Sequence, residues 1–439
     1  MHDKDQAMKR RVVVTGAGCV TPLGAEVTEV WDRLVEGRSG IGPITLFDAG
    51  SFPVRIAAEV RDWDLSDVGE DPAAWQNHPR QTAFAIGAAE KAFRSAGLAE
   101  SNIDPPRLGV YLGCGETFQD FMQFARWVSA ADGNGGFKPR KFIEEAFRTL
   151  RDDRAFEYEP DMPAYLMAGK FNAQGPNANC TAACVSSSQA IGEAAEAIRR
   201  GEADAMLAGG AHSMIHPLGV TGFLNLSVLS LSNEEGPKAM RPFDRGRNGF
   251  VIGEGGGIVV LEELEHARRR GADIWGELTG FGSAQDAFRL TDADPEARGV
   301  SSCVRQALDN ARLNPDDIDY VNAHGTSTKI NDKIETLAIK RVFGRRAYRL
   351  PVSSTKSMTG HFTTACGAIE TIISLMAIRT GVVPPTINYE TPDPDCDLDY
   401  VPNQAREVPC KHVLSNNLGF GGQNVALVVS RFKNGSMPV

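Results

Sequence analysis

Hydrophobic positions follow two alternating patterns along the chain. Short apolar runs that end in glycines predict buried strands, and longer segments with apolar residues at helical spacing predict amphipathic helices. The expected strands are 11–18, 107–115, 204–211, 256–264, 317–325 and 424–432. The expected helices are 80–98, 186–203, 302–313, 334–344 and 365–381. Strands and helices in this order predict an α/β fold with helices on both faces of its sheets.

Two parts of the chain share this layout, in which strands end in glycine-rich turns and lead into helices. The repetition predicts an internal duplication, with one half at 8–265 and the other at 266–439. The segment 118–165 differs, because it is rich in charged and aromatic residues. Its pattern predicts a mostly helical insertion of about 40 residues within the first half.

Composition narrows the possible classes of protein. The chain has 439 residues, of which 42% are apolar, and its net charge is −10. An acidic chain is a poor non-specific binder of nucleic acid. No apolar run reaches the ~20 residues that span a bilayer, and the apolar run near the N-terminus is too short for a signal peptide. We expect a cytoplasmic protein with neither nucleic acid nor membrane as a partner.

The eight cysteines are scattered, and only Cys180 and Cys184 lie close together in the sequence. A disulfide framework is not expected in a long chain without a secretory signal. Zinc ribbons use C-x2-C motifs in duplicate, and the sequence contains none, so we expect no metal site. For seven of the eight residues the simplest interpretation is a buried, unreactive thiol.

Cys184 is the exception, because it directly precedes an expected helix. A helix N-terminus lowers the pKa of a thiol and presents free backbone N–H groups. Its small neighbours Ala182, Ala183 and Ser186 leave room for a substrate to reach the sulfur. Cys180 lies four residues earlier in an extended stretch, where no helix dipole acts on it. The sequence therefore predicts that Cys184 is a nucleophile and that Cys180 is a packing residue.

Two histidines also occupy loop positions next to expected helices. His324 ends an apolar strand, at the edge where open α/β sheets place their sites, and Gly325 follows it. His361 precedes a helix, and Lys356 lies five residues upstream. A helix N-terminus favours a neutral imidazole, which can donate a hydrogen bond from Nε2 without carrying charge. Taken alone, each histidine is more typical of a turn residue bonded to the backbone.

The glycine-rich stretch 12–24 has two interpretations. Gly16 and Gly18 after a strand fit part of a dinucleotide-binding fingerprint. Pro22 interrupts the turn where that fingerprint is already helical, and the expected acidic residue about 20 positions later is missing. A tight turn after the strand is therefore favoured over a nicotinamide site.

The stretch 415–424 also has two interpretations. Glycines permit unusual dihedral angles and a close approach of ligand to backbone. The stretch is either a flexible loop or a loop whose backbone N–H faces an oxyanion, with Phe420 as a movable gate. The glycines concerned are Gly419, Gly421 and Gly422.

A cysteine, two histidines and exposed backbone N–H groups together suit thioester chemistry. The chain resembles β-ketoacyl-(acyl carrier protein) synthases of the elongating, type II condensing-enzyme class over nearly its whole length. The motifs that carry the resemblance are "VVVTGAGCVTPLG", the Cys184 stretch, "HGTST" with "DKIE", "SSTKSMTGH" and "GFGG". The resemblance implies a thiolase-like fold, with duplicated α/β halves in five layers, normally as a homodimer.

The resemblance also implies roles for individual residues. Cys184 carries the acyl group, and His324 and His361 act in decarboxylation and stabilise the enolate of a malonyl thioester. Lys356 is the active-site lysine, held near Glu335.

Further residues line the expected site around these groups. The backbone of Cys184 and Phe420, with Gly421 and Gly422, forms the oxyanion hole and gate. Other expected contacts are Thr326 and Thr328 to the phosphopantetheine arm, and Glu116, Leu418 and Phe250 to the acyl group.

The implied partner is an acyl carrier protein, whose phosphopantetheine arm carries the substrates, so no cofactor of the enzyme's own is expected. A heterodimer with a related subunit is the alternative to the homodimer. Carrier proteins are acidic, so a basic patch is the expected docking surface. The candidates are 138–141, 267–270 and 344–349, although such runs are more often solvated faces.

Several residues depart from the usual family pattern. Glu116 stands where an aliphatic residue usually lines the acyl pocket, and an unpaired buried carboxylate costs several kcal/mol. Leu418 replaces an aromatic residue, Gln423 replaces a threonine, and Val185 replaces a small hydroxyl residue. We expect a specialised condensing enzyme, from a polyketide-like or polyene pathway, with a shorter or more polar acyl group than in long-chain fatty-acid synthesis.

Three rival functions belong beside this one. A thiolase needs a second catalytic cysteine in the last motif, and "GFGGQN" has none. A malonyl-carrier decarboxylase without condensation needs only the two histidines. A non-catalytic chain-length subunit shares the fold but typically lacks the nucleophilic cysteine, which is present here as Cys184.

Overall fold

The fold is built on ten strands that run in one continuous order. The computed structural model describes residues 10–99, 103–115, 121–133, 135–150 and 159–433. In the described residues the sheet order is β10-β9-β13-β14-β8-β1-β7-β6-β4-β5. The strands are β1 (Val12–Val20), β4 (Leu108–Cys114), β5 (Asn177–Asn179), β6 (Ala205–His212), β7 (Gly255–Glu263), β8 (Gly276–Gln285), β9 (Tyr320–Asn322), β10 (Val352–Ser353), β13 (His412–Gly419) and β14 (Gln423–Ser430).

The ten strands form two copies of one five-stranded arrangement. In the first half, β5 and β4 are parallel, β4 and β6 are parallel, and β7 is antiparallel to both β6 and β1. In the second half, β10, β9, β13, β14 and β8 repeat these pairings in the same order. In the described residues the strands of the two copies join where Val13 and Val14 of β1 pair with Glu277 and Gly276 of β8. The predicted duplication of α/β halves is therefore visible in the topology.

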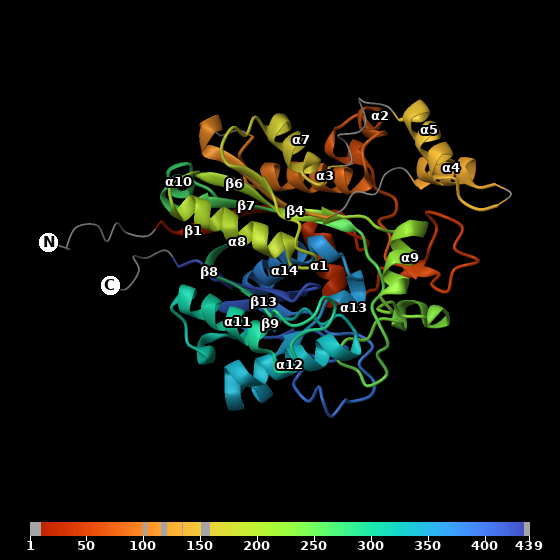
Figure 1. Ribbon diagram of the computed structural model, residues 1–439. Helices are drawn as coiled ribbons and strands as arrows, with labels where there is room; N and C mark the ends of the chain where they lie inside the picture. Colours follow the sequence, from red (N-terminus) through yellow and green to blue (C-terminus); the bar gives the residue numbers. More distant parts are fainter. Residues whose placement is uncertain (1–9, 100–102, 116–120, 134, 151–158, 434–439) are drawn as a thin grey trace.

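Helices complete the layers around the two sheets (Figure 1). α3 (Arg80–Ser95) packs on β1 and β7, and α11 (Arg298–Ala311) packs on β8 and β14 with α12 (Lys329–Phe343) beside it. α8 (Ser186–Arg199) and α14 (Cys366–Thr380) lie between the sheets and contact each other. The order helix, sheet, helix pair, sheet, helix gives the five layers that the sequence predicts.

α14 shows why the middle layer is the centre of the molecule. Every residue from Cys366 to Ile378 is buried, and most of them are apolar or small. A helix that is apolar on all sides must be covered on all sides, as happens between two sheets. Glu370 is the one carboxylate within this helix, and it is also buried.

Glycines in β1 allow β1 and α3 to pack closely together. Gly16 and Gly18 lie within the strand, and a Cβ on Gly16 would stand 2.6 Å from the carbonyl oxygen of Ala92. The strand thus continues beyond the predicted turn at Gly18 to Val20. The glycine pair in this stretch lets α3 approach the strand closely.

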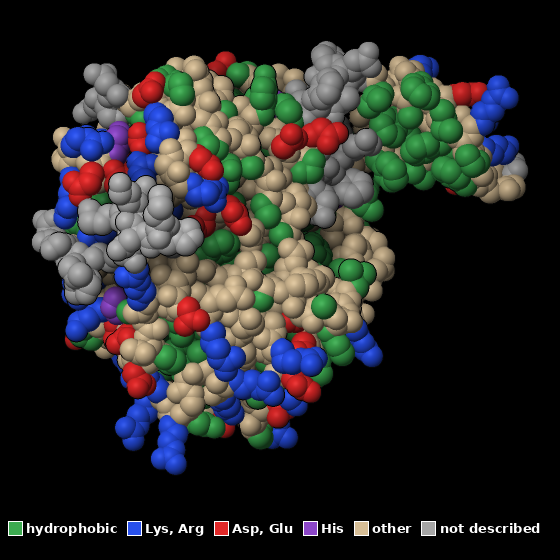
Figure 2. All heavy atoms as spheres, turned by 60° about the vertical axis from the view of Figure 1, so that its left-hand side comes forward, with side chains coloured by type: hydrophobic (Ala, Val, Ile, Leu, Met, Phe, Trp, Pro, Cys, Tyr) green, Lys and Arg blue, Asp and Glu red, His purple; other side chains and the backbone are tan. Residues whose placement is uncertain are grey.

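The predicted insertion contains helices in its described part. α4 (Phe121–Ala131) and α5 (Pro139–Thr149) pack against each other and project from the body of the molecule (Figure 1). Figure 2 shows a dense group of hydrophobic side chains on this projection. Phe137, Ile143 and Phe147 are exposed there.

The remaining elements are short and connect the layers. The helices are α1 (Val27–Val35), α2 (Pro72–Trp75), α7 (Met162–Phe171), α9 (Pro217–Asn225), α10 (Leu264–Arg269) and α13 (Lys356–Thr359). The 3₁₀ helices are η1 (Leu65–Val68), η2 (Pro105–Arg107), η4 (Asn233–Lys238), η5 (Pro315–Asp317), η6 (Gly344–Arg349) and η7 (Thr363–Ala365). Two small strand pairs are β2 (Gly42–Pro43) with β3 (Ile56–Ala57), and β11 (Val382–Val383) with β12 (Arg406–Glu407). Among the helices in the described residues, none has the length and apolar character needed to cross a bilayer.

Three elements differ from the sequence prediction. β9 covers only Tyr320–Asn322, so His324 lies in the loop beyond the strand. β8 is missing from the prediction because glycine and polar residues interrupt its hydrophobic pattern. β13 is missing because buried polar residues, including Asn416 and Asn417, stand inside it. The stretch 415–424 is therefore the tip of the β13–β14 hairpin and not a free loop.

Candidate active site

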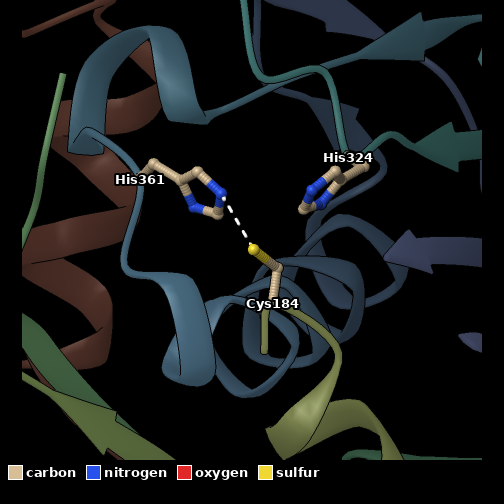
Figure 3. Close-up of side chains that lie close together, drawn as sticks. All are labelled: Cys184, His324 and His361. Carbon is tan, nitrogen blue, oxygen red and sulfur yellow. Dashed lines mark hydrogen bonds between the residues drawn. The ribbon is translucent and has the colours of Figure 1, made fainter. Parts of the chain in front are cut away.

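Three loops between secondary-structure elements bring together Cys184, His324 and His361 (Figure 3). Cys184 lies between β5 and α8, His324 follows β9, and His361 lies between α13 and α14. All three side chains are buried, and their potential ligand atoms lie within 4.8 Å of one another. The Sγ atom of Cys184 is 3.3 Å from Nε2 of His361. The structure thus brings together the three residues that the sequence singled out.

The turn before α8 aims Cys184 at the two histidines. Ala183 has a φ of 49°, in the left-handed region, which costs a non-glycine residue on the order of 1–3 kcal/mol. Ser186 stabilises the turn, because its hydroxyl donates to the carbonyl oxygen of Ala183 at 2.7 Å and accepts from the N–H of Ala182 at 2.8 Å. A strained turn at a helix start is typical of a site that presents a nucleophile.

The Cys184 thiol is protonated at neutral pH in the free protein. Burial raises its pKa to about 11, although the charge of Lys356 and the backbone N–H groups of Phe420 and Cys184 act in the opposite direction. The sequence argument predicted a lowered pKa from the helix N-terminus alone. That prediction is wrong in direction, because loss of hydration outweighs the helix dipole in a buried site.

His361 has a defined tautomer. Its Nδ1 accepts a hydrogen bond from the backbone N–H of Thr363 at 3.1 Å and lies 3.1 Å from Sγ of Cys366. A nitrogen that accepts carries no hydrogen, so the hydrogen is on Nε2, which faces Cys184. Burial, together with the nearby charge of Lys356, holds the pKa of His361 well below its usual range. The ring is therefore neutral and can donate from Nε2.

His324 is oriented from both its backbone and its ring. The N–H groups of His324 and Gly325 donate to the Glu335 carboxylate at 2.7 and 2.8 Å. The ring stands 5.3 Å from that of His361, at an interplanar angle of 83°. Burial, the charge of Lys356 and the proximity of His361 hold the pKa of His324 well below its usual range.

Lys356 has a different partner from the predicted Glu335. Its Nζ forms a buried ion pair with Oε1 of Glu370 on α14. Burial lowers the pKa of Lys356, but its charge interactions with Glu370, Cys366 and Glu335 and its hydrogen bond to Glu370 together outweigh burial, so that the pKa is raised. Glu335 instead caps the His324 loop, and burial raises its pKa to about 7. Sequence reasoning missed Glu370, although a lone carboxylate in an otherwise apolar helix is a detectable signal.

A pocket of about 280 Å³ leads to the three residues. Its lining includes the predicted pantetheine contacts Thr326 and Thr328, and the predicted acyl-pocket residues Phe250 and Leu418. The Phe250 ring meets the His361 ring edge to face, with centroids 4.7 Å apart. Glu116, the remaining predicted pocket residue, lies outside the described residues.

Phe420, the predicted gate, lies at the tip of the β13–β14 hairpin. Phe420 lines the pocket, and its backbone N–H is directed at the Cys184 sulfur. Gly421 and Gly422 have φ values of 84° and 79°, which the turn requires and which other residues rarely adopt. The N–H groups of Cys184 and Phe420 together form a pair of donors around the sulfur.

The same three side chains also have the donor types of a zinc site. A histidine ligates a metal through a nitrogen without hydrogen. Nδ1 of His361 accepts from Thr363, and Nδ1 of His324 faces the amide nitrogen of Asn417 at 3.3 Å. The hydrogens are then on the Nε2 atoms, and that of His361 faces the sulfur (Figure 3). The donor set therefore suits hydrogen bonding to a substrate better than metal binding.

The three basic candidates for carrier docking lie apart from the residues that line this pocket. The run 138–141 begins α5, the run 267–270 ends α10, and the run 344–349 forms η6. Arg268 and Arg270 in the second run form ion pairs with Glu265 and Glu262. Carrier docking at any of these runs stays a prediction.

Family models match most of the chain. Residues 9–267 match the N-terminal domain of beta-ketoacyl synthases, and residues 275–390 match the C-terminal domain. The 3-oxoacyl-[acyl-carrier-protein] synthase 2 of Coxiella burnetii is 44% identical over 96% of this chain and 99% of its own length. A putative polyketide beta-ketoacyl synthase 1 of Streptomyces halstedii is 43% identical over 96% and 98%.

Solved structures show the same fold. A type II polyketide synthase acyl-carrier protein in complex with its ketosynthase, bound to the hexaketide, matches with a TM-score of 0.85 and 34% identity. The ishigamide ketosynthase/chain length factor matches with a TM-score of 0.85 and 32% identity. Each match covers 97% of this chain and 100% of the other. With its thiolase-like architecture and its Cys-His-His centre, this chain belongs to the beta-ketoacyl synthase family.

Proposed function

We propose that this protein is a β-ketoacyl-(acyl carrier protein) synthase, which condenses an acyl group on Cys184 with a malonyl thioester and releases CO2. The observation that carries the proposal is the geometry at the base of the pocket. A buried thiol lies 3.3 Å from a neutral imidazole nitrogen, with the second imidazole beside it. This arrangement contains a nucleophile and two hydrogen-bond donors for one thioester.

The first step is acyl transfer to Cys184. The sulfur attacks the carbonyl carbon of the acyl-carrier thioester, and the N–H groups of Cys184 and Phe420 hold the resulting oxyanion. The carbon–sulfur bond to the carrier then breaks. The proton of the Cys184 thiol ends on the departing carrier thiolate, so the step is balanced without an external acid or base.

The second step forms a carbon nucleophile from the malonyl-carrier. The bond to the carboxylate breaks, CO2 leaves, and its electron pair forms an enolate on the thioester. His324 and His361 donate from Nε2 to the enolate oxygen. Because the pKa of each ring is well below its usual range, neither needs to be protonated for this role.

The third step joins the two units. The enolate carbon attacks the acyl carbon on Cys184, and the tetrahedral oxyanion occupies the same pair of backbone donors. Collapse breaks the carbon–sulfur bond and releases the β-ketoacyl-carrier. The Cys184 thiolate takes up one proton and returns to the thiol, which its pKa of about 11 favours.

The pocket also fits a carrier-bound substrate. Thr326 and Thr328 line it, and their hydroxyls lie 2.9 Å apart. We expect these hydroxyls to bind the amides of a phosphopantetheine arm, so that the carrier brings the substrate and no free cofactor is required. The relatives' names include the acyl carrier protein, and one similar structure pairs a ketosynthase with a chain length factor. A homodimer or a heterodimer with a related subunit is the corresponding assembly.

The acyl substrate is proposed to be shorter or more polar than a long fatty chain. Support comes from Leu418, which is buried and lines the pocket together with Phe250, and from Glu116 in the sequence. The named relatives include both fatty-acid and polyketide enzymes at nearly the same identity. Rates of Cys184 acylation, measured across a series of acyl-carriers, test the proposed acyl substrate. Fastest transfer from saturated C12–C16 chains would show it to be wrong.

The rival functions make different predictions for one experiment. Purified protein is mixed with acyl-carrier, its intact mass is measured, and malonyl-carrier is then added. A condensing enzyme gains the acyl mass on Cys184 and loses it as β-ketoacyl-carrier appears. A decarboxylase releases CO2 without ketoacyl product, and a non-catalytic subunit does neither. Because Cys184 and both histidines are present and in contact, we expect the first outcome.

A further inference from the structure

We propose that Asn417 is a positioning residue, which fixes the tautomer of His324 and so prepares Nε2 to donate to the enolate. The inference rests on the proposed function, since it concerns the decarboxylation step. Asn417 is fully buried in β13, and its amide touches three parts of the site. Sequence analysis assigned no role to this residue.

The contacts of the amide place it at the centre of a polar network. Its Nδ2 is 2.6 Å from Oε2 of Glu370 and 3.3 Å from Nδ1 of His324. Its Oδ1 accepts a hydrogen bond from the hydroxyl of Ser188. Glu370 is in turn paired with Lys356. One side chain therefore connects the buried ion pair, the histidine and the helix that begins after Cys184.

The orientation of this amide follows from the chemistry of its neighbours. The Glu370 carboxylate, paired with Lys356, can only accept hydrogen bonds, so the NH2 group of Asn417 must face it. The carbonyl oxygen then faces Ser188, whose hydroxyl can donate. A flipped amide would place its oxygen against Glu370, in an environment where two acceptors repel each other.

The orientation of the Asn417 amide determines which ring nitrogen of His324 carries the hydrogen. The NH2 group has a second hydrogen, and it points at Nδ1 of His324. Nδ1 must accept, so the neutral ring carries its hydrogen on Nε2, toward Cys184 and His361. Without Asn417, Nδ1 could carry the hydrogen and donate it toward Glu370. Nε2 would then be an acceptor, which repels an enolate oxygen.

Packing holds Asn417 in this position. A Cβ on Gly367 would stand 1.8 Å from Oγ of Ser188 and 2.8 Å from Oδ1 of Asn417, so only glycine fits between the two middle helices there. Ser188 lies one turn after Cys184 on α8. The same contacts that let α8 and α14 approach closely therefore fix the amide beside His324.

The test separates the two half-reactions. Asn417→Leu keeps the volume and removes every hydrogen bond of the side chain. We expect decarboxylation of malonyl-carrier to fall about 10²-fold, because a wrong histidine tautomer disables the donor. Acylation of Cys184, which depends on the thiol and the backbone donors, should stay within about threefold, since a lost remote contact has little effect on that step.

Two further variants distinguish positioning from a general structural role. Ser188→Ala removes only the contact to Oδ1 and should give a smaller loss of decarboxylation than Asn417→Leu. Ser374→Ala is the matched control, because its hydroxyl donates to the Glu370 carbonyl oxygen at 2.7 Å and it does not contact His324. This control should leave both half-reactions unchanged.

A pH profile and nitrogen NMR distinguish a positioning role of Asn417 from a purely structural role, which would change neither measurement. The wild-type decarboxylation rate should be flat from pH 5.5 to 8.5, whereas that of Asn417→Leu should rise toward acid pH, because a proton bound at Nε2 restores the hydrogen-bond donor. Selective ¹⁵N labelling should show hydrogen on Nε2 of His324 in the wild type and on Nδ1 in the variant. Equal losses in both half-reactions, or an unchanged tautomer, would overturn the inference. A wild type that releases no CO2 would refute the proposed function instead.

Discussion

The two halves of the molecule share a backbone plan and differ in their polar residues. α8 and α14 occupy equivalent places, each following the edge strand of its sheet, and they meet in the middle layer. Cys184 precedes α8, whereas His361 precedes α14. The duplicated junctions therefore face each other, and one supplies the Cys184 thiol while the other supplies the His361 imidazole.

The strands next to these edges show the same division. β4 and β9 are equivalent, and the chain after β9 carries His324 in its loop. The buried ion pair of Lys356 and Glu370 and the carboxylate of Glu335 also belong to the second half. Among the described residues, the second half thus holds the charged groups around the site, and the first half contributes the thiol. A duplicated framework allows this division of roles because its two halves evolve different side chains at equivalent positions.

Replacing the nucleophile should have the largest effect. Cys184→Ala removes the atom that forms the acyl-enzyme, so condensation should fall by more than about 10³-fold. Decarboxylation of malonyl-carrier should persist, because both histidines remain. Rates of ketoacyl-carrier formation and CO2 release measure the two effects. Cys180→Ala is the control, and a comparable loss in it would contradict the assignment.

Replacing a donor of the second half should affect the other half-reaction. His324→Ala should lower decarboxylation by about 10²- to 10⁴-fold, in the range of a positioned proton or hydrogen-bond donor. Cys184 should still gain an acyl group, since its own contact is to His361. Parallel loss of acylation and decarboxylation would show that the halves do not divide the chemistry in this way.

Loss of the buried ion pair between Lys356 and Glu370 should lower the stability of the protein strongly. Lys356→Met leaves Glu370 buried without its partner, which costs about 3–5 kcal/mol in the free energy of unfolding. The double variant Lys356→Met with Glu370→Leu should regain much of this loss, because it removes both charges. Denaturant unfolding measures the three variants. A double variant as unstable as the single one would contradict this explanation.

A contact between the halves should make stability depend on pH. Nδ1 of His212, at the end of β6, is 2.6 Å from the hydroxyl of Thr363, and burial lowers the pKa of His212 to about 3. Below pH 6.5 His212 binds a proton in the unfolded chain, whereas in the folded protein it stays neutral down to about pH 3. Folding stability should therefore fall by up to about 1.4 kcal/mol per pH unit between pH 6.5 and 3 on account of this residue.

His212→Gln tests that dependence, since glutamine does not titrate. Unfolding curves at several pH values should show a shallower acid decline in this variant than in the wild type. Identical slopes would mean that His212 is already protonated in the folded protein.

The smallest effect is expected from Cys366. Its thiol lies beside Nδ1 of His361, which also accepts from Thr363. Cys366→Ala removes one of two contacts and should reduce decarboxylation by about two- to fivefold, as expected for a weak hydrogen bond. Cys366→Ser keeps a donor and should retain the wild-type rate. A serine variant as slow as the alanine variant would indicate a packing effect.

Much of this site could be predicted from the sequence. Cys184, His324 and His361 each stand in a recognisable motif at an expected helix start, and the structure brings them together. Periodicity placed β1, β4, β6, β7 and β14 and the main helices, because these elements are buried and regular. Leu418 and Phe250 line the same pocket as these three residues, and their contact with an acyl group stays a prediction.

The errors have physical causes. β13 carries buried polar residues because its side chains belong to the site, so a hydrophobic pattern does not reveal it. The pairing of Lys356 with Glu370 depends on how α13 and α14 pack, which no local pattern encodes. The raised pKa of Cys184 also follows from burial by distant elements. Local sequence patterns identify the residues of the site, whereas tertiary packing determines which groups they contact.

The central claim is that the thiol of one half and the histidines of the other act on the same two substrates. A single-turnover experiment tests it most directly. Enzyme preloaded with an acyl group on Cys184 is mixed with malonyl-carrier, and CO2 and β-ketoacyl-carrier are counted together. We predict one CO2 and one ketoacyl product for each acyl group lost from Cys184. Release of CO2 while the acyl group stays on Cys184 would contradict it.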